Sequence, residues 1–428
     1  MLPRLTLLAA IFMSIAAAPA DDAAIVHALN RLTYGPRPGD VERVKSIGLE
    51  KWIEAQLGSR ATEGTEGPEH TRAAAITDVS DRMTRQRQLM ALQAAKVMRA
   101  AYSERQLEEI LVDFWFNHFN VFAGKGMTRN YVVEYERDAI RPYVLGNFRD
   151  MLGATAKSPA MLFYLDNWLS SSADGAGRPQ AKRANGINEN YARELLELHT
   201  LGVDGGYTQQ DIVNVAKAFT GWTMRPRQGS GFMFAANRHE RGDKVVLGHA
   251  IRSGGIDEGE RVLDIVAAHP STARHIARKL AMRFVSDTPP AALVDRAAAA
   301  FTSTGGDLRA VVKAIVTSPQ FSTPAARRAK VKTPLEFVAS ALRATGAEVR
   351  NALPLARTLR DMGMPLYFCQ PPTGYDETAP AWVTAGALVS RMNFAVDLSK
   401  NAVQGVRVPL SEAQTAALKI GAPEFQRQ

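Results

Sequence analysis

The chain has 428 residues, of which 46% are hydrophobic and 22% are charged, and its formal net charge is +9. This composition is typical of a globular protein with a sizeable core, and it excludes a collagen-like, rod-like or disordered chain. The single cysteine, Cys369, excludes an internal disulfide and any zinc site that needs two or four cysteines.

The first 20 residues have the pattern of a secretory signal peptide. Arg4 precedes an apolar stretch, and Ala18-Pro19-Ala20 is a typical cleavage site. An uncleaved membrane anchor is the alternative, but the stretch is shorter than the roughly 18 residues that a span needs. We therefore expect cleavage near Ala20 and a periplasmic or secreted mature protein, residues 21–428, with no transmembrane span.

The positive charge is spread over the chain rather than gathered in one basic stripe. An exported protein without such a stripe, interleaved with aromatic residues, is a poor binder of nucleic acid. We expect no nucleic-acid partner and a weak, generic attraction to anionic surfaces of the cell envelope.

Helical periodicity dominates the mature chain. Helices are expected within residues 22–33, 39–57, 76–122, 129–152, 158–170, 189–201, 208–221, 257–268, 271–285, 290–303, 306–317, 332–345, 352–361 and 380–403. Two starts are well marked: Thr208 has Asp211 three residues later, and Ser271 directly follows Pro270. Ser158 is also expected to cap a helix whose first residue is Pro159.

Strand signals are few, and residues 232–234 and 244–247 are expected to pair as a small hairpin. The polar loop at 170–186 is predicted to be a lid or a disordered insertion. We predict a mainly α fold: one large helical domain over residues 21–428 with a small β-hairpin near 232–247. Two lobes of that domain would meet near residues 225–256.

Several segments resemble a known bacterial family, domain of unknown function 1800. They are FWFNHF (114–119), NENYARELLELHTLGVDGGYTQQDI (188–212), TGW (220–222), RHERGDKVVLG (238–248), HPSTARHIARKLAMRFV (269–285) and GMPLYFCQPPTGY (363–375). The resemblance covers nearly the whole mature chain. It implies an exported, largely helical protein without an established activity, often encoded beside another exported family. The family usually has a histidine where this chain has Phe116, which argues against a role that needs two imidazoles there.

An acidic pair on the helix expected at 189–201 is the first candidate site. On an α-helical wheel Glu194 and Glu197 share one polar face, whereas His199 points to the opposite side. Two carboxylates one turn apart suit a divalent cation or an acid–base pair. The alternative is that both carboxylates pair with arginines of neighbouring helices and that His199 is a core histidine.

A polar stripe in the aromatic segment at 107–122 is the second candidate. Asp113, Asn117 and Asn120 share this stripe, and His118 points elsewhere. Because buried polar groups need partners, the stripe predicts either a hydrogen-bonded connection between helices or one wall of a site. His118 alone is typical of a core histidine with its hydrogen bonds satisfied.

His239 lies beside the expected hairpin, where it would be either a metal ligand or a solvated loop histidine. The H-E-x-x-H, G-x-S-x-G, phosphate-loop and C-x-x-C-H motifs are all missing from the sequence. No established catalytic signature therefore assigns a reaction.

Two functions remain open. The favoured one is a cell-envelope scaffold or binding protein that works with a co-exported envelope partner. The alternative is a metal-assisted hydrolase, in which a divalent metal activates a water molecule. Its metal ligands would be His118, Glu194, Glu197, His199 and His239, and its catalytic residues Glu194, Glu197, Asp113 and Asn117. Convergence of three or more of these side chains within about 5 Å would favour the enzyme.

Overall fold

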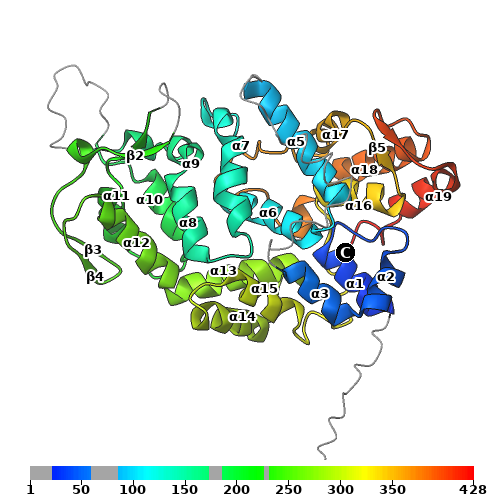
Figure 1. The fold of residues 1–428 in the computed structure, drawn as a ribbon, viewed down its shortest axis with the longest axis horizontal. Coiled ribbons are helices and arrows are strands. Elements are labelled where there is room, and N and C mark those ends of the chain that lie inside the picture. Colours follow the sequence, from blue (N-terminus) through cyan, green and yellow to red (C-terminus); the bar gives the residue numbers. More distant parts are fainter. Residues whose placement is uncertain (1–21, 59–84, 173–185, 226–230) are drawn as a thin grey trace, which may run out of the picture.

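The chain runs from one end of an elongated molecule to the other and back again (Figure 1). The computed structural model describes residues 22–58, 85–172, 186–225 and 231–428. These residues are mainly helical with small two-stranded sheets, which confirms the predicted fold class. The signal peptide predicted at 1–20 and most of the loop at 170–186 lie outside them.

The helices of the outward run are α1 Asp22–Leu32, α2 Asp40–Ile47, α3 Leu49–Leu57, α5 Arg85–Tyr102, α6 Gln106–His118, α7 Val132–Glu134, α8 Phe148–Lys157, α9 Pro159–Tyr164, α10 Asn190–Glu194 and α11 Gln209–Ala218. Those of the return are α12 Ile256–Ala268, α13 Pro270–Phe284, α14 Ala291–Ser303, α15 Leu308–Val316, α16 Pro334–Ala344, α17 Leu353–Asp361, α18 Ala385–Ser399 and α19 Leu410–Gly421. The short helical turns are η1 Thr128–Asn130, η2 Tyr135–Ile140, η3 Arg141–Tyr143, η4 Asn167–Leu169, η5 Leu195–His199, η6 Ala236–Arg238 and η7 Ala379–Ala381.

The helix starts expected at Ser158 and Thr208 are confirmed, whereas α13 begins one residue before the expected Ser271, at Pro270, with His269 as its cap. The Ser158 side chain caps α9 in front of Pro159, and Thr208 and Asp211 form a reciprocal capping box at the start of α11. The Asp211 carboxylate also accepts a hydrogen bond of 2.7 Å from the Leu247 backbone N–H, which ties α11 to the end of β3. Capping residues in the sequence therefore predict the starts of α9 and α11 correctly.

The two predicted strands, at 232–234 and 244–247, are confirmed, but their expected pairing is wrong and four further strands were not predicted. The strands of the described residues are β1 Trp222–Met224, β2 Phe232–Phe234, β3 Lys244–Val246, β4 His249–Ile251, β5 Glu348–Val349 and β6 Val406–Arg407. β2 pairs with β1 and β3 pairs with β4, both antiparallel. The turn at Leu247–Gly248 closes the second hairpin locally, so β3 pairs with the strand that follows it rather than with β2.

Two π-helical turns interrupt the helices. The chain passes from α7 into η2 and from α10 into η5, and both η2 and η5 are π-helical. A π turn takes more residues than an α turn, so side chains beyond it are rotated relative to an α-helical wheel. The α-helical wheel that separated His199 from Glu194 therefore does not apply to residues 195–199.

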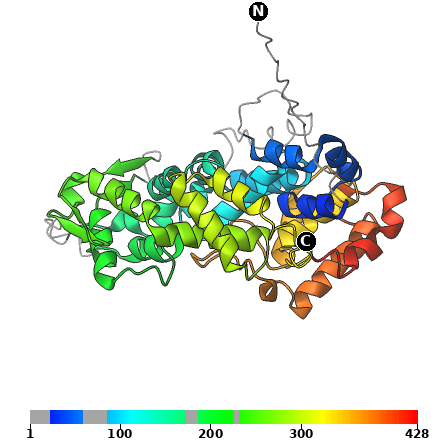
Figure 2. The same cartoon turned by 90° about the horizontal axis from the view of Figure 1, so that it is seen from below.

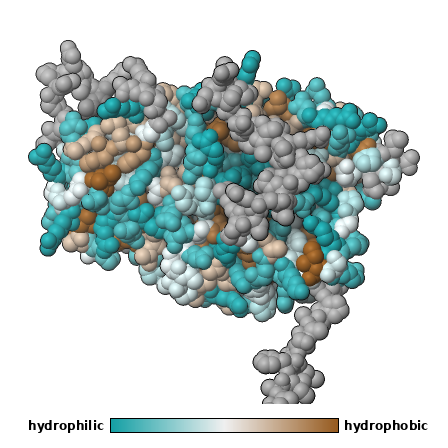
Figure 3. Space-filling view, viewed as in Figure 1, coloured by the Kyte–Doolittle hydropathy of each residue, from teal (hydrophilic) through white to brown (hydrophobic). Residues whose placement is uncertain are grey.

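The core is continuous and rich in aromatic side chains. Trp115 of α6 is fully buried and packs against Phe119 and Phe148. The face shown in Figure 3 is largely hydrophilic, with smaller apolar areas between polar ones. No helix among the described residues is long and apolar enough to pass through a lipid bilayer.

The last two long helices, α18 and α19, pack side by side at one end of the molecule (Figure 2). The sequence predicts a helix at 380–403, which α18 confirms in part, but no helix at 410–421, where α19 lies. Arg391 reaches from α18 into the core, where it donates a hydrogen bond of 2.7 Å to the Lys332 carbonyl. The inner face of α18 is thus fixed, and its outer face is directed away from the core.

Candidate functional site

The Asp113–Asn117–Asn120 stripe of α6 faces the segment at 364–377. Asp113 forms an ion pair of 2.8 Å with Lys96 of α5. Asn117 forms two hydrogen bonds with the Tyr375 backbone, donating to its carbonyl at 2.8 Å and accepting from its N–H at 2.7 Å. Asn120 donates to the carbonyls of Cys369 and Pro371 at 3.0 and 2.7 Å. The stripe therefore connects α6 to helix α5 through Asp113, as one of its two predicted roles required, and to the loop through Asn117 and Asn120.

Close packing at Gly374 makes this connection tight. Gly374 has a φ of +76°, and an added Cβ would lie 2.3 Å from the Asn117 carbonyl oxygen. Only glycine combines that backbone conformation with so close an approach. Gly374 of the loop and Asn117 of α6 thus fix the position of the loop against the helix.

A small cavity opens where the loop leaves α6, and we call it the Glu377 cavity. Its free volume is about 40 Å³, which is room for little more than one water molecule. It is lined by Asp113, Phe114, Asn117, Arg283, Lys330, Val331, Thr333, Glu336, Met364, Tyr375, Asp376 and Glu377. Asp113 and Asn117 also line a smaller cavity beside it. The stripe therefore both holds the loop against α6 and lines the cavity.

The cations around the Glu377 cavity already have partners. Arg283 pairs with Glu336, which also accepts hydrogen bonds from the Thr333 N–H at 2.8 Å and from Gln428 at 2.7 Å. Lys330 pairs with Asp287. Burial alone would raise the pKa of Glu336, but Arg283 and these hydrogen bonds outweigh burial and lower it.

Glu377 is the exception in this network. Part of the residue is exposed, but both carboxylate oxygens are shielded from water and have no hydrogen-bond partner among the residues that the structure describes. Burial raises the pKa of this carboxyl, against the opposing influence of Lys279, Arg283 and Lys330. A shielded carboxyl without a partner is costly, so its position beside a cavity is a mark of a binding site.

A cluster of histidines lies next to this region. The His118 ring centre is 6.2 Å from those of His199 and His275, and His118 Nε2 is 3.1 Å from the His199 carbonyl oxygen. Burial, followed by the charge of Lys279, lowers the pKa of His199 to about 3 and that of His275 to about 4. His118 shifts in the same direction. These imidazoles are neutral at physiological pH.

Lys279 of α13 acts electrostatically on both the histidine cluster and Glu377. It lowers the pKa values of the three histidines and opposes the rise in the pKa of Glu377. Within the described ranges it forms no ion pair or hydrogen bond. His118 Nδ1 and His199 Nε2 are likewise buried without a partner.

The acidic pair of α10 and η5 lies apart from the histidine contacts. Burial, and then the neighbouring Glu197 carboxylate, raise the pKa of Glu194, which shows that the two groups are close. Glu197 is hydrogen-bonded to the Tyr207 hydroxyl. Arg193 pairs with Glu189 at 3.4 Å, so the expected pairing of Glu194 and Glu197 with arginines of neighbouring helices does not occur among the described residues.

His239 is held in a buried structural network. Its Nε2 lies 3.0 Å from Glu258, which also pairs with Lys244, and its Nδ1 lies 2.8 Å from the Thr220 carbonyl oxygen. His239 is 7% exposed, so it is not a solvated loop histidine. It connects β3 and the start of α12.

The five predicted metal ligands thus fall into three groups of contacts: His118 with His199, Glu194 with Glu197, and His239 with Glu258. Across the part of the chain that the structure describes, no three His, Cys, Asp or Glu side chains are arranged to hold a metal ion.

Sequence reasoning missed the groups that surround the cavity opposite the stripe, namely Lys279, Arg283, Glu336 and Glu377. Their charges meet only through tertiary contacts, and no spacing in the sequence marks them. One signal was available: Lys279 and Arg283 lie in the segment at 269–285, and Glu377 follows the segment at 363–375. Both segments carry the family resemblance.

Comparison with known proteins gives one match. A family model described as "Protein of unknown function (DUF1800)" matches residues 27–426. No curated protein and no solved structure matches the chain. Segments that carry the resemblance, at 114–119, 188–212, 269–285 and 363–375, meet around the histidine cluster and the Glu377 cavity.

Proposed function

The chain belongs to the DUF1800 family, and because that family has no established activity, we propose a function from the geometry of this member. It is an exported binding protein of the cell envelope that takes the polar head group of a small ligand into the Glu377 cavity. The signal-peptide pattern at 1–20 supports export to the periplasm. Peptide sequencing of the mature protein tests that part, since it should begin near Asp21.

The observation that carries the proposal is the free carboxyl of Glu377. Its oxygens accept no hydrogen bond, although burial of such a group without a partner costs more than a typical hydrogen bond returns. The nearby cations Arg283 and Lys330 are engaged by Glu336 and Asp287. The carboxyl therefore has acceptor capacity that the protein leaves unused.

The cavity also limits the chemistry of the ligand. It has room for one small group, and Phe114 and Met364 contribute apolar wall beside the carboxyl. An ammonium or hydroxyl group would supply the missing donor, while the rest of the ligand would extend out of the cavity. Sugars and amino sugars of the envelope have this form.

The first test compares two glutamates of the same region. Glu377→Gln should leave the melting temperature unchanged or raise it, because it removes an uncompensated charge. Glu336→Gln should destabilise the protein by about 3 kcal/mol, because it leaves Arg283 without its partner. Both variants are measured by thermal and denaturant unfolding.

Ligand binding is tested on the same variants with glucosamine and glucose as a matched pair of probes. A saturable rise in the melting temperature of the wild type that is lost in Glu377→Gln supports the proposal. The difference between the probes distinguishes an ammonium from a hydroxyl group. If neither probe shifts the wild type, or if both proteins shift equally, the proposal fails.

The metal-assisted hydrolase receives less support, because its five ligands are divided among three groups of contacts and one ion would not reach all of them. Of the proposed metal ligands, Glu194 and Glu197 are the pair whose carboxylates are close enough to share one ion. The co-exported protein partner remains a proposal that rests on the family resemblance.

A further inference from the structure

The exposed apolar side chains of the described residues are concentrated at one end of the molecule. Six of the nine large ones belong to α18, α19 or the residue pair before α18, and they are Val383, Leu388, Val389, Met392, Val396 and Leu418. The other three, Ile47, Val203 and Val245, lie in separate elements. Single exposed apolar residues are ordinary, but a concentration of this kind marks an interaction surface.

Four of these residues form a line on the outside of α18, which we call the α18 stripe. Leu388, Val389, Met392 and Val396 follow the i, i+3/i+4 spacing that places side chains on one helix face. Val389 and Met392 are 56% and 58% exposed. The stripe is therefore an outer surface of the fold and not a partly open core.

The opposite face of α18 is packed, so the helix cannot turn its stripe inward. Phe394 contacts Phe337 of α16, with ring centres 6.0 Å apart, and Arg391 is hydrogen-bonded to the Lys332 carbonyl. Ala395 and Leu398 are also buried. The stripe thus needs a partner from outside this packing.

The charges near the stripe are mostly positive. Lys400 follows the last turn of α18, Lys419 is next to the exposed Leu418 on α19, and both are exposed. Asp397 is the one exposed carboxylate among the described side chains of α18 and α19.

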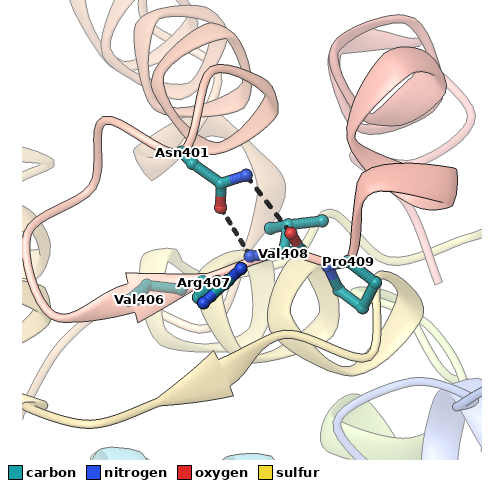
Figure 4. A pocket seen from close by; sticks show the side chains of 5 residues that line it. All are labelled: Asn401, Val406, Arg407, Val408 and Pro409. Atoms are coloured by element: carbon teal, nitrogen blue, oxygen red, sulfur yellow. Dashed lines mark hydrogen bonds between the residues drawn. The ribbon is translucent and has the colours of Figure 1, made fainter.

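A further cation lies beyond the end of α18. Asn401 holds the segment after β6 there, because it accepts a hydrogen bond of 2.6 Å from the Val408 N–H and donates one of 3.2 Å to the Val408 carbonyl (Figure 4). The exposed Arg407 is thereby kept in the hollow beside that end. The net charge of the whole chain, these residues included, is +9.

We propose that the α18 stripe docks the protein on an anionic lipid surface. Its apolar side chains would enter the boundary between head groups and acyl chains, while Lys400 and Arg407 would lie among anionic head groups. Apolar area and cation–lipid attraction together determine the strength of such interfacial binding. The inference does not rest on the Glu377 cavity, which adjoins the buried inner face of α18 near Lys332 and not the exposed stripe.

The experiment uses the mature full-length protein and vesicles of phosphatidylethanolamine with phosphatidylglycerol, against vesicles of phosphatidylcholine alone. The wild type should co-sediment with the anionic vesicles and less so at high salt. Met392→Glu should weaken binding about tenfold or more, since burial of one such side chain is lost and a charge is repelled. Lys400→Glu should reduce binding and its salt dependence.

Val203→Glu is the matched control, because Val203 is 66% exposed but precedes α11, a helix at the end of the molecule opposite α18 (Figure 1). It should bind like the wild type, and Met392→Glu should keep the wild-type melting temperature. Failure of the wild type to bind anionic vesicles, or an equal loss in Val203→Glu, overturns the proposal. So does self-association that Met392→Glu abolishes without any lipid binding, because the stripe would then join two copies of the chain.

Discussion

Three carboxylates show how the surroundings of a residue decide its role. Glu336 has a guanidinium and two hydrogen-bond donors, Glu377 has no partner, and Glu194 lies beside Glu197. The sequence identified only the last of these, because a spacing of three residues is visible along the chain. The partners of Glu336 come from segments as distant as Arg283 and Gln428, so no local pattern could reveal them.

At this scale we expect Glu194→Gln to stabilise the protein slightly at neutral pH, by less than about 1 kcal/mol, because it removes repulsion from Glu197. Glu189→Gln is the control: it weakens the pair with Arg193 and should cause a small loss instead. Urea unfolding curves measure both effects. A marked loss of stability in Glu194→Gln would contradict this, and the loss of a bound metal in elemental analysis would instead support the hydrolase hypothesis.

The elements of the site were partly predictable. The helices α6, α11 and α13 and the polar stripe of α6 follow from apolar periodicity and capping residues. The loop that the stripe holds could not be predicted, because its contacts are backbone carbonyls and N–H groups that any sequence carries. The π-helical turn η5 also escaped prediction, since an apolar pattern five residues long does not distinguish α from π turns.

At the scale of the element, two glycines of the same segment provide a matched test of the contact between α6 and the loop. Both have positive φ, but a Cβ on Gly374 would meet Asn117, whereas a Cβ on Gly363 would meet nothing within 4 Å. Gly363→Ala should therefore cost about 1 kcal/mol of backbone strain. Gly374→Ala should cost about 3 kcal/mol or more and weaken ligand binding in the Glu377 cavity.

Denaturant unfolding of the two variants measures this difference. Equal losses would show that backbone strain alone accounts for both positions and that the close approach to Asn117 has no energetic role.

At the scale of the whole molecule, stability should fall as the pH drops below about 6.5. Burial lowers the pKa of His27 and His275 to about 4 and that of His199 to about 3, from an ordinary value of 6.5. Between these values the unfolded chain binds protons that the folded chain does not, so acid favours unfolding. Each histidine contributes about 1.4 kcal/mol per pH unit in that window.

A second loss should follow below pH 4.5. There the Glu136 carboxyl takes up a proton in the unfolded chain but not in the folded chain, where the cations Lys96, Arg99 and Arg141 hold its pKa at about 2 against the effect of burial. Melting temperatures recorded from pH 8 to pH 3 test both windows. The His199→Asn variant should have a shallower slope between pH 6.5 and 4, and an unchanged slope would rule out His199 as a source of the effect.

The path of the chain has a consequence for how the protein reaches its folded state. His27 and Arg31 of α1 are bonded to the carbonyls of Phe321 and Ala326, almost 300 residues away. The first helix packs against α2 and α6 early in the chain, but it completes its native contacts only when residues 321–326 are present. We expect folding to be slow and to finish late, so that a chain threaded through a membrane channel from its beginning stays unfolded until nearly all of it has emerged.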